Sequence, residues 1–194
     1  MPSLFAITDV VGQDHLLNPD APLGRMLITG KVTSFILWGP PGCGKTTIAR
    51  LLAHHTDMYF EPISAVFSGV SDLRRIFDEA KQRRQSGRAT ILFVDEIHRF
   101  NRSQQDGFLP YVEDGTVVLV GATTENPSFE LNAALLSRCK VFVLKRLTED
   151  ALESIIKRAE QQVGRALPVT NEAREQLKSM ADGDGRYLSN MLEA

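Results

Sequence analysis

Short apolar segments alternate with segments of helical periodicity between residues 32 and 144. The apolar segments predict strands that are buried on both faces, and the periodic segments predict amphipathic helices. Strands are predicted at 32–38, 58–63, 89–94, 116–122 and 141–144, with helices at 45–54 and 71–85. Ser103, with Asp106 three residues later, is predicted to cap a further helix. This alternation predicts an α/β fold in which flanking helices cover both faces of a five-stranded parallel sheet.

After residue 146 the chain keeps only helical periodicity. Three helices are predicted, the first with Leu152, Ile155 and Ile156 among its apolar positions, the second with Ala173, Leu177 and Met180, and the third with Tyr187, Leu188, Met191 and Leu192. The pattern predicts an α/β domain over residues 1–146 and a helical domain over residues 147–194. Because the third helical pattern stops with the chain, we expect the helical domain to be part of a longer protein.

The composition is that of an ordinary folded protein. Of the 194 residues, 43% are hydrophobic and 24% are charged, and the net charge of −2 argues against a wholly basic nucleic-acid binder. The two cysteines, Cys43 and Cys139, are too few for a disulfide scaffold, and reduced thiols are expected. No apolar run approaches the roughly 20 residues of a membrane helix, and no basic residue precedes Arg25 to begin a signal peptide. These features predict a cytoplasmic protein without membrane contact.

A phosphate-binding loop pattern, G-x-x-x-x-G-K-T, lies between the first predicted strand and the first predicted helix. It consists of Gly39, Pro40, Pro41, Gly42, Cys43, Gly44, Lys45 and Thr46, with Thr47 directly after it. Glycines let backbone N–H groups approach phosphates at a helix N-terminus, where anions are favoured. Lys45 is expected to reach the β- and γ-phosphates of ATP, and the Thr46 hydroxyl to bind Mg²⁺. The alternative, a turn rich in glycine and proline with an exposed lysine, does not account for the strand and helix on its two sides.

Two carboxylates, Asp95 and Glu96, follow the apolar residues Ile91–Val94. A strand buried on both faces presents its first polar groups at its carboxyl edge, beside the phosphate-binding loop if the two strands are neighbours. Asp95 is then expected in the Mg²⁺ shell, and Glu96 is expected to orient and deprotonate the attacking water. The alternative is that the pair caps the start of a helix.

Further segments carry a resemblance to a known family. Together with the two motifs above, Val11-Gly12-Gln13, the DEIHRF segment, Gly121–Thr124 and Leu136–Cys139 resemble an AAA+ ATPase of the clade of clamp loaders and branch-migration motors. Three longer strings, at 63–70, at 93–101 with 103–106, and at 121–132, are similar to the replication-associated recombination protein A (RarA/MgsA) family. The resemblance extends from about Val10 to the end of the chain.

The resemblance implies roles for individual residues. Thr124 matches the sensor-1 residue, which lies between the two motif-bearing strands and contacts the γ-phosphate or the water, and Asn126 is a weaker candidate for this role. Arg138 matches the arginine finger that enters a neighbouring subunit's site, and Val11 and Gly12 match the segment that lies against the adenine. The alternatives are that Thr124 only ends a strand and that Arg138 is a surface arginine.

Arg186 matches the sensor-2 arginine of the helical lid. The chain departs from the family here, since a second basic residue and small alanines usually follow this arginine, whereas Tyr187, Leu188 and Ser189 follow it in this sequence. The family's usual basic stretch before the Val-Gly-Gln segment is also absent. The alternative interpretation of Arg186 is that it simply opens a helix.

The resemblance implies a Mg²⁺-dependent ATPase that forms homo-oligomers. It implies action on single-stranded or forked DNA at stalled replication forks, with ATP, ADP, DNA and replication proteins as partners. The alternatives are a clamp-loader subunit, a Holliday-junction branch-migration motor, or a small-molecule P-loop kinase. Arg99 and Arg102 either face DNA or form a solvated surface, and the histidines show no metal-ligand spacing.

Overall fold

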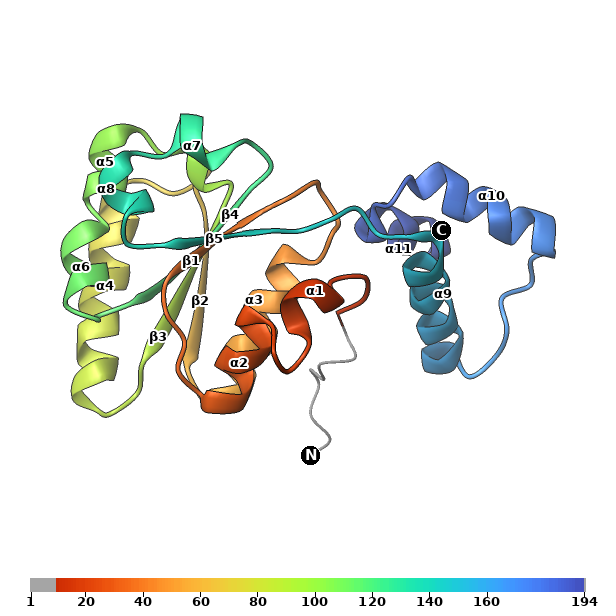
Figure 1. The fold of residues 1–194 in the computed structure, drawn as a ribbon, viewed down its shortest axis with the longest axis horizontal. Coiled ribbons are helices and arrows are strands. Elements are labelled where there is room, and N and C mark those ends of the chain that lie inside the picture. The colour runs from red at the N-terminus through yellow and green to blue at the C-terminus, as the bar shows by residue number, and fades with distance from the viewer. Residues whose placement is uncertain (1–9, 194) are drawn as a thin grey trace.

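The computed structural model describes residues 10–193 and confirms the five-stranded parallel sheet (Figure 1). Its strands are β1 (Phe35–Trp38), β2 (Tyr59–Ser64), β3 (Thr90–Asp95), β4 (Val118–Thr123) and β5 (Lys140–Val143). They lie in the order β2-β3-β4-β1-β5, and every neighbouring pair is parallel. All five carboxyl ends therefore meet at one edge of the sheet.

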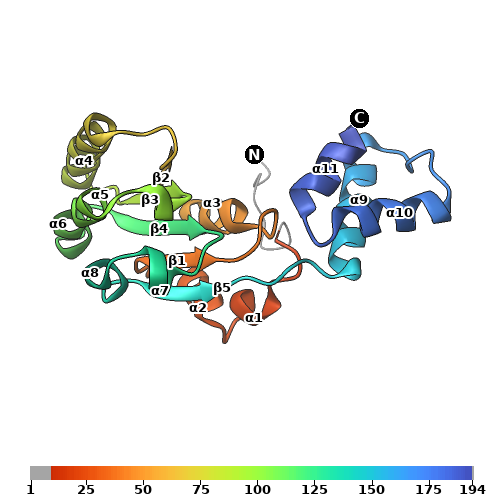
Figure 2. The same ribbon diagram turned by 90° about the horizontal axis from the view of Figure 1, so that it is seen from above.

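Successive strand residues enter two different hydrophobic clusters, because side chains alternate between the faces of a strand. Phe35 and Leu37 pack in one cluster, while Ile36, between them, packs in the other. The first face is covered by α1 (Asp14–Leu17), α2 (Pro22–Thr29) and α3 (Lys45–His55). The second is covered by α4 (Val70–Gln85), η2 (Ile97–Arg99), α6 (Leu109–Glu113) and α8 (Ala133–Leu136). Two short helices lie between these in the chain: α5 (Arg102–Asp106) before α6, and α7 (Pro127–Glu130) before α8. Figure 2 shows these two helical layers with the sheet between them.

Several predicted boundaries need correction. The strand predicted at 32–38 begins only at Phe35, and the sequence pattern predicts neither α1 nor α2. Ser103 does not cap a helix; Asn101 caps α5 instead, accepting a hydrogen bond from the Gln104 N–H at 2.9 Å. The Gln104 side-chain oxygen in turn accepts a hydrogen bond from the Asn101 N–H at 3.0 Å. The capping box therefore lies two residues earlier than predicted. The helices predicted at 45–54 and 71–85 are confirmed to within one residue at each end.

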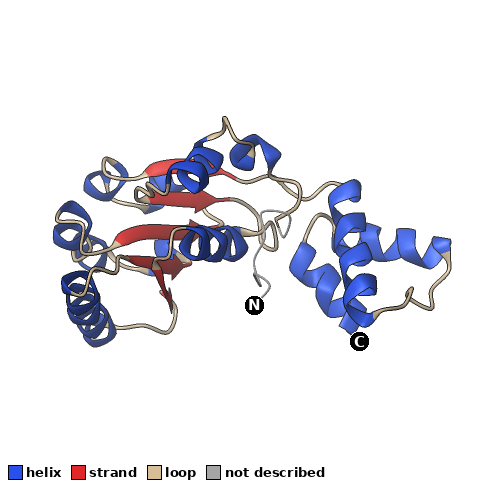
Figure 3. Ribbon diagram, turned by 90° about the horizontal axis from the view of Figure 1, so that it is seen from below, coloured by secondary structure: helices blue, strands red, loops and turns tan. Residues whose placement is uncertain are grey.

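The C-terminal part of the described chain contains only helices and loops (Figure 3). Its helices are α9 (Glu149–Val163), α10 (Asn171–Ala181) and α11 (Gly185–Glu193). They share a hydrophobic cluster of their own, formed by Leu147, Ala151, Leu152, Ile156, Ala181 and Leu188. Met180 and Tyr187, which the pattern predicts as apolar positions of this core, are exposed. The separation into domains at residues 146 and 147 stays a prediction, and residues 1–9 of the first domain lie outside the described residues.

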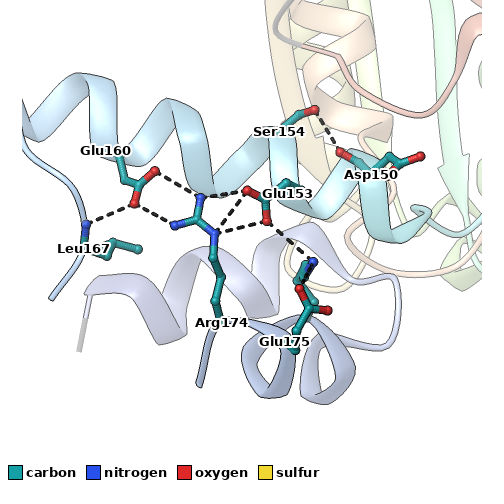
Figure 4. A network of polar contacts seen from close by, with 8 residues as sticks. Asp150, Glu153, Ser154, Glu160, Leu167, Arg174 and Glu175 are labelled. Carbon is teal, nitrogen blue, oxygen red and sulfur yellow. Dashed lines mark hydrogen bonds and ion pairs between the residues drawn. The ribbon is translucent and has the colours of Figure 1, made fainter. Parts of the chain in front are cut away.

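One arginine joins the first two of these helices (Figure 4). Arg174 of α10 donates hydrogen bonds to both Glu153 and Glu160 of α9, with its terminal nitrogens 2.8 Å and 2.7 Å from their nearest oxygens. The Glu160 carboxylate also accepts from the Leu167 N–H at 3.0 Å, which ties down the connection between the helices. These contacts compensate the partial burial of Arg174 and orient α10 on α9.

The contacts made by Arg174 predict an acid-sensitive link. Hydrogen bonds from Arg174 lower the pKa of Glu160 from 4.5 to about 2 and also lower that of Glu153. A carboxyl group whose pKa is lower in the folded state stabilises it above the unfolded pKa, and this stabilisation is lost as the pH falls toward the folded pKa. We expect amide-exchange protection in α9 and α10 to fall in the wild type between pH 5 and pH 3. The Arg174→Met variant should lose little further protection over the same range, and an equal pH dependence in both proteins would contradict the assignment.

Candidate nucleotide-binding site

The phosphate-binding loop joins β1 to α3 and ends at Gly44, which caps α3. Gly42 has a φ of +66°, a left-handed conformation that glycine adopts without strain. Lys45, the first residue of α3, is buried, and its Nζ donates to the carbonyl oxygens of Gly39 and Pro40, both at 2.8 Å. The loop thus holds an ammonium group within its curve, at the N-terminus of a helix, where phosphates bind favourably.

A cavity of about 580 Å³ opens over this loop at the carboxyl edge of the sheet. The α/β part lines it with residues of the loop, of the strand ends and of the N-terminal segment: Val10, Val11, Pro41, Gly42, Cys43, Gly44, Lys45, Thr46, Thr47, Asp95, Glu96 and Thr124. The helices α9 and α11 line its other side with residues that include Ile155, Arg158, Arg186 and Leu192. Most of the predicted site residues are therefore brought together. Gly12, Gly39, Pro40, Asn126 and Arg138 do not line it.

The C-terminal helices close the cavity by direct contact with the phosphate-binding loop. The Gly185 N–H donates to the Gly42 carbonyl oxygen at 3.1 Å. A Cβ atom on Gly42 would lie only 1.8 Å from a carboxylate oxygen of Asp184, so this approach requires glycine. Arg186 follows in the first turn of α11 and faces the cavity, as its match to a lid arginine implied.

A buried glutamine, Gln13, fixes the N-terminal segment to the same loop. Its side-chain N–H groups donate to the carbonyl oxygens of Cys43, at 3.2 Å, and Lys145, at 2.8 Å, and its oxygen accepts from the Lys145 N–H. Gly12, next to it, has a φ of +72° and passes close to the side chains of Leu147 and Ala151. Gly12 itself does not line the cavity, but it positions Val11, which does. The sequence places Gln13 within a motif but predicts no role for it.

The two carboxylates lie at the end of β3, and β4 separates this strand from β1. The strands are therefore not direct neighbours, and Thr124 at the end of β4 lies between the motifs, as its match to sensor-1 implied. Glu96 adopts a left-handed backbone conformation with a φ of +53°, which costs a non-glycine residue about 1–2 kcal/mol. The fold compensates this strain and aims the Glu96 side chain at the cavity.

His98 connects Glu96 to β4, and sequence reasoning missed this contact. Its Nδ1 lies 2.9 Å from the Thr123 hydroxyl oxygen and 3.3 Å from Oε2 of Glu96, a buried oxygen that has no hydrogen bond. The Thr123 hydroxyl can donate its own proton to the Glu125 carbonyl, so we assign the imidazole proton to Nδ1. A bare lone pair on Nδ1 would instead face the Glu96 carboxylate. The sequence Asp-Glu-Ile-His indicates that the segment is functional, but only the fold shows that His98 contacts Glu96 and Thr123.

The donors at this edge suit Mg²⁺. The Thr46 hydroxyl and the Asp95 carboxylate line the same cavity, and oxygen ligands are those that Mg²⁺ prefers. Mg²⁺ commonly uses one or two protein ligands together with phosphate oxygens and water, and Thr46 and Asp95 supply two protein oxygen groups.

Arg138 lies away from its own cavity. It precedes β5, whose first residue pairs with Phe35 at the amino end of β1, so Arg138 is at the edge of the sheet opposite the carboxyl ends. Its guanidinium forms an ion pair with Glu113 and donates to the Ala134 carbonyl oxygen at 2.7 Å. An arginine in this position has no access to the nucleotide of its own chain.

The cysteine of the loop is structural. Cys43 is almost fully buried, and this burial raises the pKa of its thiol, although the nearby Lys45 charge acts in the opposite direction. Burial also raises the pKa of Cys139 to about 11. Both thiols therefore stay protonated near neutral pH and are poor nucleophiles.

Residues 35–147 match the family described as "ATPase family associated with various cellular activities (AAA)". The chain belongs to the AAA family of ATPases. This membership agrees with the parallel sheet, the phosphate-binding loop and the two carboxylates at the end of β3. No helix among residues 10–193 combines the length and the apolar character needed to cross a membrane.

The similarity to the RarA family is also confirmed. The chain is 53% identical to the replication-associated recombination protein A of Coxiella burnetii and 47% identical to that of Escherichia coli K12, over 96% of its length in each case. It is 47% identical to ATPase WRNIP1 of Dictyostelium discoideum. The alignments cover 43% of each bacterial relative and 22% of the Dictyostelium protein.

Solved structures show the same fold. One variant of Thermotoga maritima RuvB superposes with a TM-score of 0.74 at 28% identity, covering 97% of this chain and 62% of that chain. A second variant of the same RuvB gives a TM-score of 0.77 at 26% identity, covering 97% of this chain and 63% of that one. Another structure of Thermotoga maritima RuvB is described as a Holliday junction branch migration motor.

The contact between His98 and Glu96 yields a test of AAA ATPase chemistry. Removing the imidazole in His98→Ala should leave the KM for ATP unchanged and lower kcat roughly tenfold, since Glu96 remains but is no longer oriented. This effect is smaller than the two to four decades expected when a general base is removed. Steady-state ATPase kinetics measure both quantities.

Two further variants control this test. His98→Asn keeps an N–H donor near the position of Nδ1 and should restore most of kcat. If the imidazole only filled space, the smaller amide could not replace it, and kcat would stay low. His55→Ala removes an exposed histidine at the end of α3 and should have no effect. Equal kcat values for His98→Ala and the wild type would exclude the positioning role.

Proposed function

We propose that the chain is the ATP-hydrolysing part of an oligomeric protein that acts on DNA at stalled or damaged replication forks. The observation that carries this proposal is the single cavity that unites the phosphate-binding loop, Asp95, Glu96, Thr124 and Arg186. The relatives named replication-associated recombination protein A support the biological setting. In this proposal residues 1–146 bind and hydrolyse the nucleotide, residues 147–194 form a lid, and the protein works in the cytoplasm with other replication proteins.

Each part of the cavity then has a chemical role. The backbone N–H groups of the loop and the Lys45 ammonium bind the phosphates, and Val11 contacts the adenine with help from Gly12. Thr46 and Asp95 hold Mg²⁺, which neutralises charge on the phosphates when it is bound. Glu96 orients the attacking water and accepts its proton.

The remaining groups, Thr124, Arg186 and Arg138, act at the γ-phosphate. Thr124 and Arg186 both line the cavity. In this proposal Thr124 contacts the γ-phosphate or the water, and Arg186 approaches from the lid. Arg138 serves the neighbouring subunit, because it lies at the edge opposite its own cavity. A ring or an open oligomer of this chain would therefore have sites completed across its interfaces.

A second candidate is a Holliday-junction branch-migration motor. The TM-score of 0.77 with a RuvB variant favours it, since that likeness covers 97% of this chain. Sequence identity favours the first candidate, because it reaches 53% with a RarA protein but 26–28% with these RuvB variants. The activity of the purified protein on forked DNA compared with four-way junctions separates the two.

The role of Glu96 can be tested by replacing its carboxylate. Glu96→Gln should keep Mg·ATP affinity within a few-fold and lower the hydrolysis rate by two to four decades, because the amide cannot accept the proton of the water. Lys45→Ala is the matched contrast, since it deletes a cation from the phosphate site and should weaken binding itself. Calorimetry and a phosphate-release assay measure the two properties, and near-normal turnover in Glu96→Gln would exclude the general-base role.

The trans-acting role of Arg138 can be tested by mixing two inactive proteins. Arg138→Ala should bind ATP normally but hydrolyse it at least 10³-fold more slowly, as expected when an arginine finger is removed. Lys45→Ala should also be inactive but keep an intact Arg138. After subunit exchange, some interfaces of the mixture combine an intact cavity with an intact arginine, and ATPase activity should reappear there.

The mixing experiment uses the full-length protein and needs two controls. Arg75→Ala removes an exposed arginine that is ion-paired within its own helix, as Arg138 is ion-paired to Glu113, and should keep full activity. Pull-down of a tagged subunit establishes that exchange has occurred. Baseline activity despite proven exchange would show that Arg138 does not act in trans.

A further inference from the structure

The peptide group between Cys43 and Gly44 lies in the phosphate-binding loop, next to Lys45. Gly44 lines the cavity with a φ of +103°, and in the described part of the chain its N–H group has no hydrogen-bond partner. Backbone N–H groups of such a loop bind phosphates. The direction of this peptide group therefore decides whether the loop presents a donor or an oxygen atom to the phosphates.

The surroundings of Gly44 do not hold this peptide group in place. Apart from the chain neighbours, the nearest atom to a Cβ built on Gly44 would be 3.8 Å away, on Val10, so the space around it is open. Glycine also has wide conformational freedom. In a planar trans peptide the carbonyl and the N–H point in opposite directions, so rotating the plane would turn the Cys43 carbonyl oxygen to where the N–H had been.

Gln13 restrains the carbonyl side of this peptide group. Its side chain is almost fully buried, at 1% exposure, and its Nε2 donates to the Cys43 carbonyl oxygen at 3.2 Å. A carbonyl held by Gln13 turns the Gly44 N–H away from Gln13. Because Gly44 lines the cavity and Gln13 does not, this orientation keeps the N–H on the phosphate side.

Two further hydrogen bonds fix the direction of the Gln13 amide. Its Nε2 donates to the Lys145 carbonyl oxygen at 2.8 Å, and its Oε1 accepts from the Lys145 N–H at 3.1 Å. The reversed amide would place an oxygen atom against the carbonyl oxygens of both Cys43 and Lys145, so donor and acceptor are assigned uniquely. One N–H of Nε2 is thus directed at Lys145 and the other at Cys43.

Lys145 lies where the chain leaves the sheet for the C-terminal helices. It is two residues past the end of β5, and the N–H of Leu147, two residues later, donates to the Gly183 carbonyl oxygen at 3.1 Å. Gln13 therefore links the phosphate-binding loop to the start of the connection that carries α9, α10 and α11.

We propose that Gln13 is a positioning residue that orients the Cys43–Gly44 peptide group for phosphate binding, with the backbone at Lys145 as its support. The Gly44 N–H then donates a charge-assisted hydrogen bond to a phosphate oxygen. A rotated peptide group would place the carbonyl oxygen against the phosphate and repel it. This inference rests on the proposed binding of ATP by the loop and names a residue outside the cavity on which that binding depends.

The test separates the phosphate part of the nucleotide from the adenosine part in the full-length protein. Gln13→Met keeps a side chain of similar length but removes its hydrogen bonds. Pyrophosphate should bind about 10- to 150-fold more weakly, the range expected for one hydrogen bond to a charged group. Adenosine should bind within about twofold of the wild type, because it carries no phosphate. Competition against a fluorescent ADP analogue measures both affinities, and equal weakening of both ligands, or of neither, would overturn the proposal.

His15 provides a matched control. Its Nε2 lies 2.9 Å from the Val143 carbonyl oxygen, so it also joins the N-terminal segment to the end of β5, but this contact does not reach the loop. His15→Ala should leave the affinities for pyrophosphate and adenosine unchanged. A loss of pyrophosphate affinity as large as that of Gln13→Met would show that any loosening of this segment has the same effect, and would contradict a specific role for Gln13.

The two cysteines give a second readout of the loop. Cys43 and Cys139 are both buried, at 1% and 8% exposure. A loop that samples two peptide orientations should expose Cys43 transiently, so Gln13→Met should raise its rate of alkylation by iodoacetamide several-fold and leave that of Cys139 unchanged. Mass spectrometry of the digested protein measures each rate. An equal rise at both thiols would indicate general loosening and would overturn the proposal.

A second variant covers the case in which Gln13→Met does not fold, as judged by circular dichroism. Gln13→Glu keeps the length of the side chain and the acceptor for the Lys145 N–H, but it lacks the amide donors. Its affinity for pyrophosphate should also fall while that for adenosine is retained. Unchanged affinity for pyrophosphate in a folded Gln13→Glu protein would exclude the positioning role.

The outcomes also separate this inference from the function on which it rests. If the wild type binds ADP and pyrophosphate and Gln13→Met binds pyrophosphate equally well, the positioning role is wrong and the proposed function stands. If the wild type binds neither ligand, the proposed binding of nucleotide is wrong, and the inference fails with it.

Discussion

The placement of β4 between β3 and β1 is the constraint on which the site depends. Val120 of β4 pairs with Phe35 of β1 on one side and with Phe93 of β3 on the other, so the three strands end nearly level. Each strand then contributes a different group at the same edge: the phosphate-binding loop, the two carboxylates, and the threonines of β4. An antiparallel strand in the middle would carry its threonines to the opposite edge and separate them from the nucleotide.

The sequence predicts the parts that depend on local pattern. The continuous apolar strands predict a sheet covered on both faces, and the Gly-rich loop between a strand and a helix predicts a phosphate site, because both signals are short and have few other solutions. Boundaries that depend on side-chain contacts are less predictable. The start of α5 is an example, since Ser103 and Asn101 are both good caps and only the reciprocal contact with Gln104 distinguishes them.

The contacts that join the site across the fold are beyond sequence patterns. Gln13 binds the carbonyl oxygens of Cys43 and Lys145, which are far from it in the chain, and His98 reaches Thr123 on a strand that is not its own. Such pairs have no characteristic spacing. The contact of Asp184 with the phosphate-binding loop is similar, because the need for glycine at residue 42 comes from the approach of Asp184 as well as from its own backbone conformation. Sequence reasoning finds the loop, and the fold shows what packs on it.

The segment from Glu96 to Arg102 joins the nucleotide site to the outer surface within a few residues. Ile97 and Phe100 are three positions apart, the repeat of the 3₁₀ turn, and both are buried in the core. Arg99 and Arg102, also three apart, are exposed, while His98 turns inward to Glu96 and Thr123. Because Ile97 and Phe100 are buried, the segment is anchored to the core on both sides of His98. The exposed arginines and the cavity-lining Glu96 therefore belong to one short segment, and His98 between them contacts Glu96, whose backbone is left-handed.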